Sequence, residues 1–299
     1  MRTPKSVLAA ALHCSGGLRN ARHEPVLLVA GTGATPHEQY SWNYEPALTA
    51  RHVPWCTVTM PDHTLGDIQV AAEYIVFAVR RMHRVAGRRI AIVGHSQGGV
   101  IPRWALKFWP DVRGRVADMI GLAPANHGTK IIRDLGTCSA ECVPAAWQLR
   151  PGSRFLRALN HPVETHSGSS YSQIYTRYDE LSTPAGARGT SPLRTGQGQI
   201  ANIALQQVCP VNPADHVLIG STDPVGFALV MDAITHRGPA RASRVSSTTC
   251  AQLVIPGLDP IAAPHVLTAF PYLVSGASPF NLVGAHKSRT EPPLRAYAR

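Results

Sequence analysis

The sequence predicts an α/β fold, in which a mostly parallel sheet is covered by helices on both faces. Short apolar runs alternate with amphipathic segments of helical period between residues 26 and 178, as they do where crossover helices join parallel strands. Charged residues make up only 16% of the chain, and Gly and Pro contribute 25 residues each. This composition is typical of a globular protein rich in turns and excludes disorder and coiled coil. At 299 residues, we expect a single domain over 1–299.

Five strands and three helices are predicted in order. The strand candidates are short apolar runs, as buried parallel strands are; they cover 26–30, 55–59, 90–93, 119–123 and 173–178. The predicted helices cover 41–50, 67–82 and 100–109. Asp67 is a capping residue for the second, whose apolar residues keep helical spacing over four turns. After about residue 240 the pattern is irregular and rich in Pro, Gly and Ser.

Charge narrows the choice of partners. The net charge is +11, and five arginines lie within residues 80–89. Nucleic acid is not expected, because no aromatic residues are interleaved and no known module is present. The arginines are expected as solvated cations at a helix C-terminus, with attraction to an anionic lipid surface as the alternative. Every apolar run is interrupted before about 20 residues, so the chain is not expected to span a membrane.

Cysteine usage predicts an oxidising compartment. Six cysteines, an even number, show neither a C-x-x-C pair nor zinc-ligand spacing; they are at 14, 56, 138, 142, 209 and 250. Three disulfides in a secreted protein are expected, against the alternative of six buried thiols in a cytosolic one. Residues 1–14 resemble a short signal peptide only weakly, so we expect that a leader has already been removed. No metal or cofactor site is apparent.

The sharpest motif is Gly94-His95-Ser96-Gln97-Gly98, between a predicted strand and a predicted helix. This is the setting of the nucleophile turn of α/β-hydrolases, in which flanking glycines let the backbone turn sharply and hold a serine out above the sheet. The following amides and the helix N-terminus favour an oxyanion, and Gln97 supplies one such amide. Ser96 is therefore the candidate nucleophile, and an ordinary turn is the alternative.

A second oxyanion donor is expected in the loop after the first predicted strand. Gly31-Thr32-Gly33 follows VLLVA directly, and Thr32 offers both an amide and a hydroxyl at the position this fold uses. A dinucleotide fingerprint would need glycine at the sixth position, which is Pro36. A plain glycine-rich turn remains the other interpretation.

The acid and base of such a site follow the serine in chain order. Asp179 comes directly after the predicted strand at 173–178 and is the best acid, with Glu180 as its adjacent rival. The base is expected at His216, where a loop enters an apolar helix-like stretch. The other histidines that follow are His236, His265 and His286. A structural or surface position is expected for the remaining histidines, including His95.

With these residues in place, the chain resembles the Candida antarctica lipase B family of secreted α/β-hydrolase lipases. The similarity covers roughly residues 4–250 in the same order and includes segments outside the serine motif. The matching stretches are PKSVLAAALHC, PVLLVAGTGAT, DIQVAAEYIVFAV, SQGGVIPRWALKFWP, LAPANHGT, IYTRYDELSTP and DHVLIGST. The first of these also argues that residues 4–14 belong to the mature protein.

The resemblance implies a role for each matched residue. It makes Ser96 the nucleophile, Asp179 the acid and His216 the base, with Thr32 and Gln97 in the oxyanion hole. It also implies the disulfides Cys14–Cys56 and Cys209–Cys250, which leaves Cys138 to pair with Cys142. Two departures concern the pocket. His95 replaces a bulky aromatic residue beside the serine, and residues after about 250, expected as an irregular extension that walls the acyl pocket, match poorly.

The sequence thus predicts a secreted, monomeric serine carboxyl-ester hydrolase, most simply a triacylglycerol lipase. The nearest alternative is a short-chain carboxylesterase or polyester depolymerase that uses the same residues. A non-catalytic protein that binds lipid or a surface is a more distant one, and a reductase that binds a nucleotide at Gly31 is weaker still. Acyl chain length, enantioselectivity and the natural substrate do not follow from the sequence.

Overall fold

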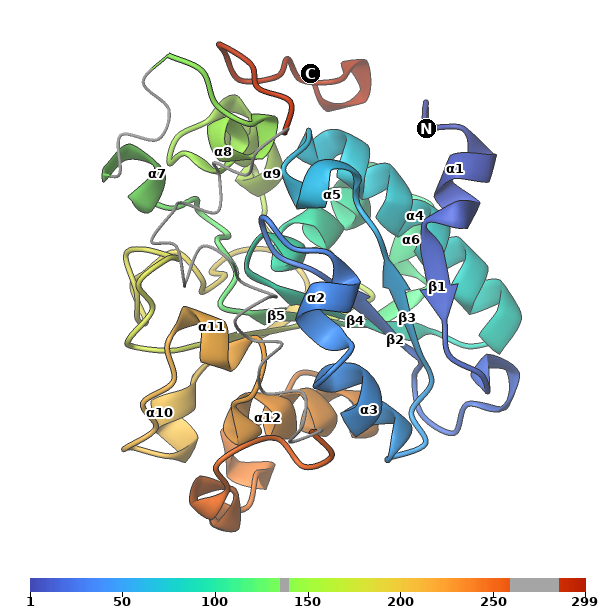
Figure 1. Cartoon of the computed structure of the whole chain (residues 1–299), viewed down its shortest axis with the longest axis vertical. Coiled ribbons are helices and arrows are strands. Elements are labelled where there is room, and N and C mark those ends of the chain that lie inside the picture. Colours follow the sequence, from blue (N-terminus) through green and yellow to red (C-terminus); the bar gives the residue numbers. More distant parts are fainter. Residues whose placement is uncertain (135–139, 259–284) are drawn as a thin grey trace.

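The computed structural model describes residues 1–134, 140–258 and 285–299, and in this part of the chain seven strands form one sheet (Figure 1). Their order is β1-β3-β2-β4-β5-β6-β7, and all neighbours are parallel except β1 and β3. The strands are β1 (Leu12–Cys14), β2 (Val26–Val29), β3 (Trp55–Val58), β4 (Ile90–His95), β5 (Val116–Leu122), β6 (Ser170–Tyr175) and β7 (Gln199–Ala204). The predicted α/β class is confirmed.

Helices cover both faces of this sheet (Figure 1). One layer comprises α1 (Lys5–Ala10), α4 (Ile68–Ala86), α5 (Ile101–Phe108), α6 (Pro110–Arg113), α7 (Ile131–Asp134), α8 (Pro144–Leu149) and α9 (Arg154–Asn160). The other comprises α2 (Pro36–Tyr40), α3 (Tyr44–Thr49), α10 (Leu205–Val208), α11 (His216–Ile219) and α12 (Pro224–Thr235). The sheet therefore separates two apolar cores.

Strand β2 contributes side chains to both apolar cores. Successive side chains of a strand point to opposite faces, so Leu27 and Val29 pack on the α4 side while Val26 and Leu28 pack on the α12 side. All four are fully buried, and each contributes about 1.5–3 kcal/mol to folding by leaving water. A continuous apolar run is thus what a strand covered on both faces requires.

Helix α4 begins at the predicted cap and continues past the predicted end at residue 82 to Ala86. The Asp67 carboxylate caps it by accepting the Gln69 N–H at 3.0 Å. Gly87 ends it in the left-handed region at φ +65°, and its N–H donates to the His83 carbonyl, which is a common glycine C-cap. The basic stretch of residues 80–89 therefore spans the last turns of α4 and the loop that follows.

Some predicted elements differ from those observed. The helix predicted over 41–50 is observed as the shorter α3, because Asn43 leaves helical geometry at φ −133° and caps α3 through its side chain. Helix α2, which comes just before it, was not predicted. The last predicted strand begins earlier and ends at Tyr175, not at residue 178. Strands β1 and β7 were not predicted, since both are edge strands that are only partly buried and neither is a continuous apolar run.

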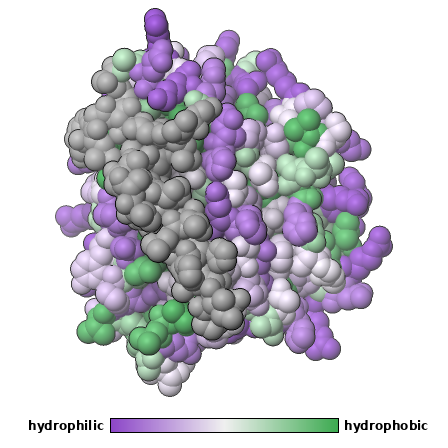
Figure 2. All heavy atoms as spheres, in the orientation of Figure 1, coloured by the Kyte–Doolittle hydropathy of each residue, from purple (hydrophilic) through white to green (hydrophobic). Residues whose placement is uncertain are grey.

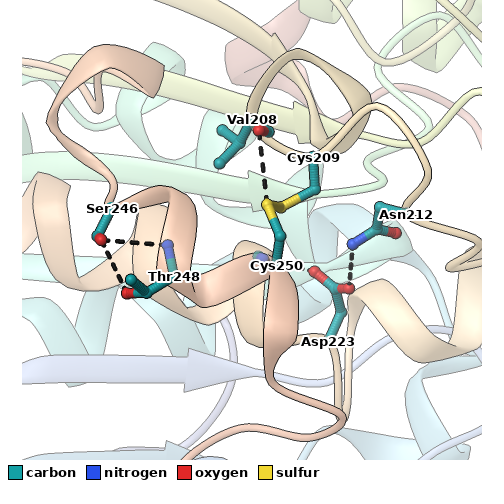
Figure 3. Close-up of a disulfide and its surroundings, with 8 residues drawn as sticks. Val208, Cys209, Asn212, Asp223, Ser246, Thr248 and Cys250 are labelled. Atoms are coloured by element: carbon teal, nitrogen blue, oxygen red, sulfur yellow. Dashed lines mark hydrogen bonds between the residues drawn. A yellow bond between two sulfur atoms is a disulfide. The ribbon is translucent and has the colours of Figure 1, made fainter.

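Two disulfides join pairs of described residues at the periphery of the fold. Cys14–Cys56 joins β1 to β3, and Cys209–Cys250 joins the residue after α10 to the turn η5 (Ser247–Ala251). Figure 3 shows the second bond beside the Asn212 amide, which donates to Asp223 at 2.6 Å. Asp223 in turn caps α12, so this corner braces the segment before α11. Cys138, the expected partner of Cys142, lies outside the described residues. So do residues 259–284 of the region after about 250 that was expected to wall an acyl pocket.

Of the described residues, one stretch, His216–Thr235, is long and apolar enough to cross a membrane. It comprises α11 and α12, and 78% of it is buried inside the protein, which is typical of a core helix. On the coloured part of the face seen in Figure 2, hydrophilic residues prevail, with small apolar patches between them.

Removing either disulfide by a double Cys→Ala substitution is expected to lower the free energy of unfolding by about 2–4 kcal/mol. The two bonds span 42 and 41 residues, so the entropy that each removes from the unfolded chain is nearly the same. Denaturant unfolding of the two variants should therefore give similar losses. A loss confined to one variant would contradict this account.

Candidate active site

Ser96 lies on a strained turn between β4 and α5. Its φ is +54°, in the left-handed region that favours glycine, and it starts the short turn η3 (Ser96–Gly99). A β-carbon on Gly94 would overlap the Gly98 carbonyl, and one on Gly98 would overlap the Val29 carbonyl. Both glycines are therefore required by the close approach of β2, β4 and the turn, which leaves the Ser96 side chain partly exposed.

His216 and Asp179 form a buried hydrogen-bonded pair. The Asp179 Oδ1 lies 2.9 Å from His216 Nδ1, and the two residues are only 6% and 2% exposed. Asp179 Oδ1 also accepts the Ser182 N–H at 2.6 Å, so the loop after β6 fixes the carboxylate. Because the carboxylate accepts a hydrogen bond from the Nδ1–H group, the neutral ring carries its lone pair on Nε2.

Three carboxylates surround the imidazole of His216. Burial disfavours the charged ring, but the carboxylates of Asp179, Glu180 and Asp215 outweigh it, and the His216 pKa is raised above its ordinary value. Glu180 also accepts the backbone N–H of His216 at 3.0 Å, and burial raises the pKa of Glu180 itself. The site is therefore built to stabilise an imidazolium cation.

His95 connects the strand that carries Ser96 to the helix that begins at His216. Its Nε2 donates to the His216 carbonyl at 2.8 Å, and the two ring centroids are 4.7 Å apart. Burial and the nearby His216 lower the His95 pKa to about 3, so this ring stays neutral. It packs so closely on Gly220 that a β-carbon there would overlap it.

The loop after β2 is fixed by two buried glutamines. Gln39 accepts the Gly31 N–H at 2.9 Å, and Gln97 accepts the Thr32 hydroxyl at 2.7 Å. Gln97 is held in turn by donating to the Thr64 carbonyl at 2.8 Å. Thr32 is therefore held next to Gln97, the residue that follows Ser96.

The structure thus brings most of the predicted residues together. It joins Asp179 to His216 and Thr32 to Gln97, while no hydrogen bond links Ser96 to His216 within the described ranges. Such bonds are often long in the absence of substrate. His236 instead pairs with Asp232 at the end of α12.

The remaining candidates of the sequence analysis fall elsewhere. His286 lies near the end of the chain, in the short segment 285–299, and His265 lies outside the described residues. Glu180 contacts the backbone of His216, not the ring nitrogen that Asp179 takes.

Two supporting residues were missed by the sequence analysis. Asp215 caps α11 by accepting the N–H groups of Val217 and Leu218, and its place directly before a helix is a signal that could have found it. Gln39 has no comparable signal, because its partner is a backbone amide on another loop. Among residues 1–134, 140–258 and 285–299, no group of three or more His, Cys, Asp or Glu could hold a metal ion.

Comparisons with known proteins relate this chain to lipases. The profile of the family described as Lipase (class 2) matches residues 73–208. Lipase B of Pseudozyma antarctica is 30% identical over 303 residues, which cover 99% of this chain and 85% of the relative. The crystal structure of Aspergillus fumigatus lipase B superposes with a TM-score of 0.88 at 26% identity, over 100% of this chain and 72% of that chain.

A more distant structure shares the fold. The propeptide form of Bacillus licheniformis lipase BlEst2 gives a TM-score of 0.53 at 16% identity, over 77% of this chain and 54% of that chain.

Replacing Glu180 by Gln is expected to lower the pKa of His216, because it removes one of the charges that favour the imidazolium ring. The amide oxygen can still accept the His216 N–H, so the backbone contact is kept. NMR titration of the imidazole measures the shift. The control is Glu141→Gln, which removes an exposed carboxylate paired with Arg289 and is expected to leave the His216 pKa unchanged. An unchanged pKa in both variants would contradict the electrostatic account.

Proposed function

The chain belongs to the lipase B family and is an ester hydrolase, and we propose that it works through an acyl-enzyme on Ser96. The observation that carries the proposal is the buried His216–Asp179 hydrogen bond, held by His95 against the strand that ends in the strained Ser96 turn. This is the nucleophile, base and acid arrangement of serine hydrolases.

Each residue has a defined part in the proposed cycle. His216 Nε2 takes the proton from the Ser96 hydroxyl as its oxygen attacks the ester carbonyl. The amides of Thr32 and Gln97, with the Thr32 hydroxyl, stabilise the oxyanion. In the free protein this hydroxyl donates to Gln97, so it must turn towards the oxyanion. The alcohol leaves with the proton from His216, and water then releases the acid by the same steps.

Asp179 keeps His216 in the tautomer that this cycle needs and stabilises its cation. The raised pKa of His216 sets the acid limit of activity, because only the neutral ring can act as base. Activity is therefore expected to fall as the pH drops through this pKa. No cofactor or metal takes part in these steps.

We propose triacylglycerols as the substrate class, which the lipase names of both relatives support. A short-chain carboxylesterase or polyester depolymerase with the same residues is the second candidate. Family membership argues against the non-catalytic and nucleotide-binding alternatives.

The proposed location is extracellular, supported by two disulfides of a kind that persists in oxidising compartments. We further propose that the protein acts as a monomer, since its own helices cover both faces of the sheet.

Ser96→Ala is expected to reduce ester hydrolysis by at least about a thousandfold while the protein stays folded. The measurement is hydrolysis of p-nitrophenyl esters from acetate to palmitate by the wild type and the variant. A maximum at medium or long chains favours the lipase, and a maximum at acetate or butyrate favours the esterase. A variant as active as the wild type would refute the proposed nucleophile.

His95 is expected to act as a positioning residue for His216, and a matched pair of variants tests this. His95→Gln keeps an N–H donor near the place of Nε2, whereas His95→Leu fills similar space without one. We expect kcat to fall by about 10- to 100-fold in the Leu variant with little change in KM, because a small displacement of the base costs rate. The Gln variant should stay within several-fold of the wild type. An equal loss of kcat in both variants would contradict a positioning role for the N–H donor of His95.

A further inference from the structure

A groove remote from Ser96 lies between the N-terminal segment and the outer face of α4. Its volume is about 810 Å³, within the range of sites that bind small molecules. One wall comes from α1, β1 and the turn η1 (Leu18–Asn20), and the other from the C-terminal half of α4. Figure 1 shows α1 and β1 running beside α4 near the N-terminus. None of the residues of the proposed active site lines this groove.

The floor and walls of the groove are apolar. Leu8 and Met82 are buried beneath it, and half-buried apolar side chains form its sides; these are Leu12, Leu18, Phe77 and Val85. Residues four apart lie on the same face of a helix, so Phe77 and Val85 line up along α4. The groove therefore leaves apolar surface in contact with water.

The rim of the groove is cationic. Lys5 comes from α1, and Arg80, Arg81 and Arg84 come from α4. Arg80 is neutralised, because it forms two hydrogen bonds with the Asp111 carboxylate at 2.8 and 2.9 Å. The other three cations form no ion pair with any described residue, and the groove lining contains no Asp or Glu. Arg81 lies one turn from both Phe77 and Val85, so a positive charge stands between two apolar side chains.

We propose that this groove binds a long-chain fatty acid as its anion. The carboxylate would take Arg81, Arg84 and Lys5 as partners, and the alkyl chain would cover the apolar floor. Guanidinium groups suit a carboxylate because they can donate two parallel hydrogen bonds. A free phosphate would leave the floor exposed, whereas a neutral lipid would leave the cations unpaired. This assignment gives a function to part of the basic stretch at residues 80–89, which the active site does not use.

The test measures binding of cis-parinaric acid, a fluorescent fatty acid, below its critical micelle concentration. All proteins carry Ser96→Ala, and the test variant adds Arg81→Glu and Arg84→Glu. The matched control adds Arg241→Glu and Lys287→Glu, which change the net charge equally at exposed cations that do not line the groove. We expect the test variant to bind cis-parinaric acid at the groove at least tenfold more weakly than the Ser96→Ala protein. The control should bind it as tightly as the Ser96→Ala protein does.

Two further measurements separate the groove from the active site. Ala9→Trp adds bulk to an exposed residue of the groove without changing charge, and it should weaken binding as well. With Ser96 restored, the Arg81→Glu, Arg84→Glu protein should hydrolyse p-nitrophenyl butyrate at the wild-type rate, so failure of this proposal is distinguishable from failure of the proposed nucleophile. Equal binding by test and control variants would overturn the proposal. The proposal would also be overturned if the protein bound the methyl ester of the fatty acid as tightly as the free acid. Binding to anionic vesicles without binding of the free fatty acid would overturn it as well.

Discussion

The close backbone contact at Gly94 and Gly98 is the constraint on which the rest of the site depends. It brings β2, β4 and the turn η3 so near one another that no side chain fits between them. The same contact forces Ser96 into a left-handed conformation, which a serine adopts only when its surroundings impose it. Packing on both faces of the sheet keeps Ser96 in this conformation, because the turn cannot relax without disturbing both apolar cores.

Two adjacent imidazoles have opposite pKa shifts because their surroundings differ in charge. His216 is surrounded by carboxylates that raise its pKa, whereas His95 is buried without a carboxylate and its pKa falls to about 3. The two rings are only 4.7 Å apart, so a charge on one disfavours a charge on the other. A neutral His95 can therefore hold the backbone of His216 throughout the proposed cycle, in which His216 gains and loses a proton.

Much of the fold could be predicted from the sequence, because its buried strands are unbroken apolar runs and α4 has a clear cap. The edge strands β1 and β7 could not, since partial exposure gives them no such run. At the site, local motifs located Ser96 and the loop at Thr32, and the resemblance to a family strengthened Asp179 and His216. The hydrogen bonds of His95 and Gln39 could not be predicted from the sequence, because each partner lies in another segment of the chain and no local pattern encodes it.

The strand order also has a consequence for synthesis. From β4 onwards each new strand is added beside the one before it, through β5 and β6 to β7. If strands pair as the chain emerges, the turn of Ser96 forms first, Asp179 arrives after β6, and His216 arrives only after the outermost strand. A growing chain would then carry Ser96 without His216 until nearly three quarters of the protein has been made, so the geometry of the candidate site is completed only late in synthesis.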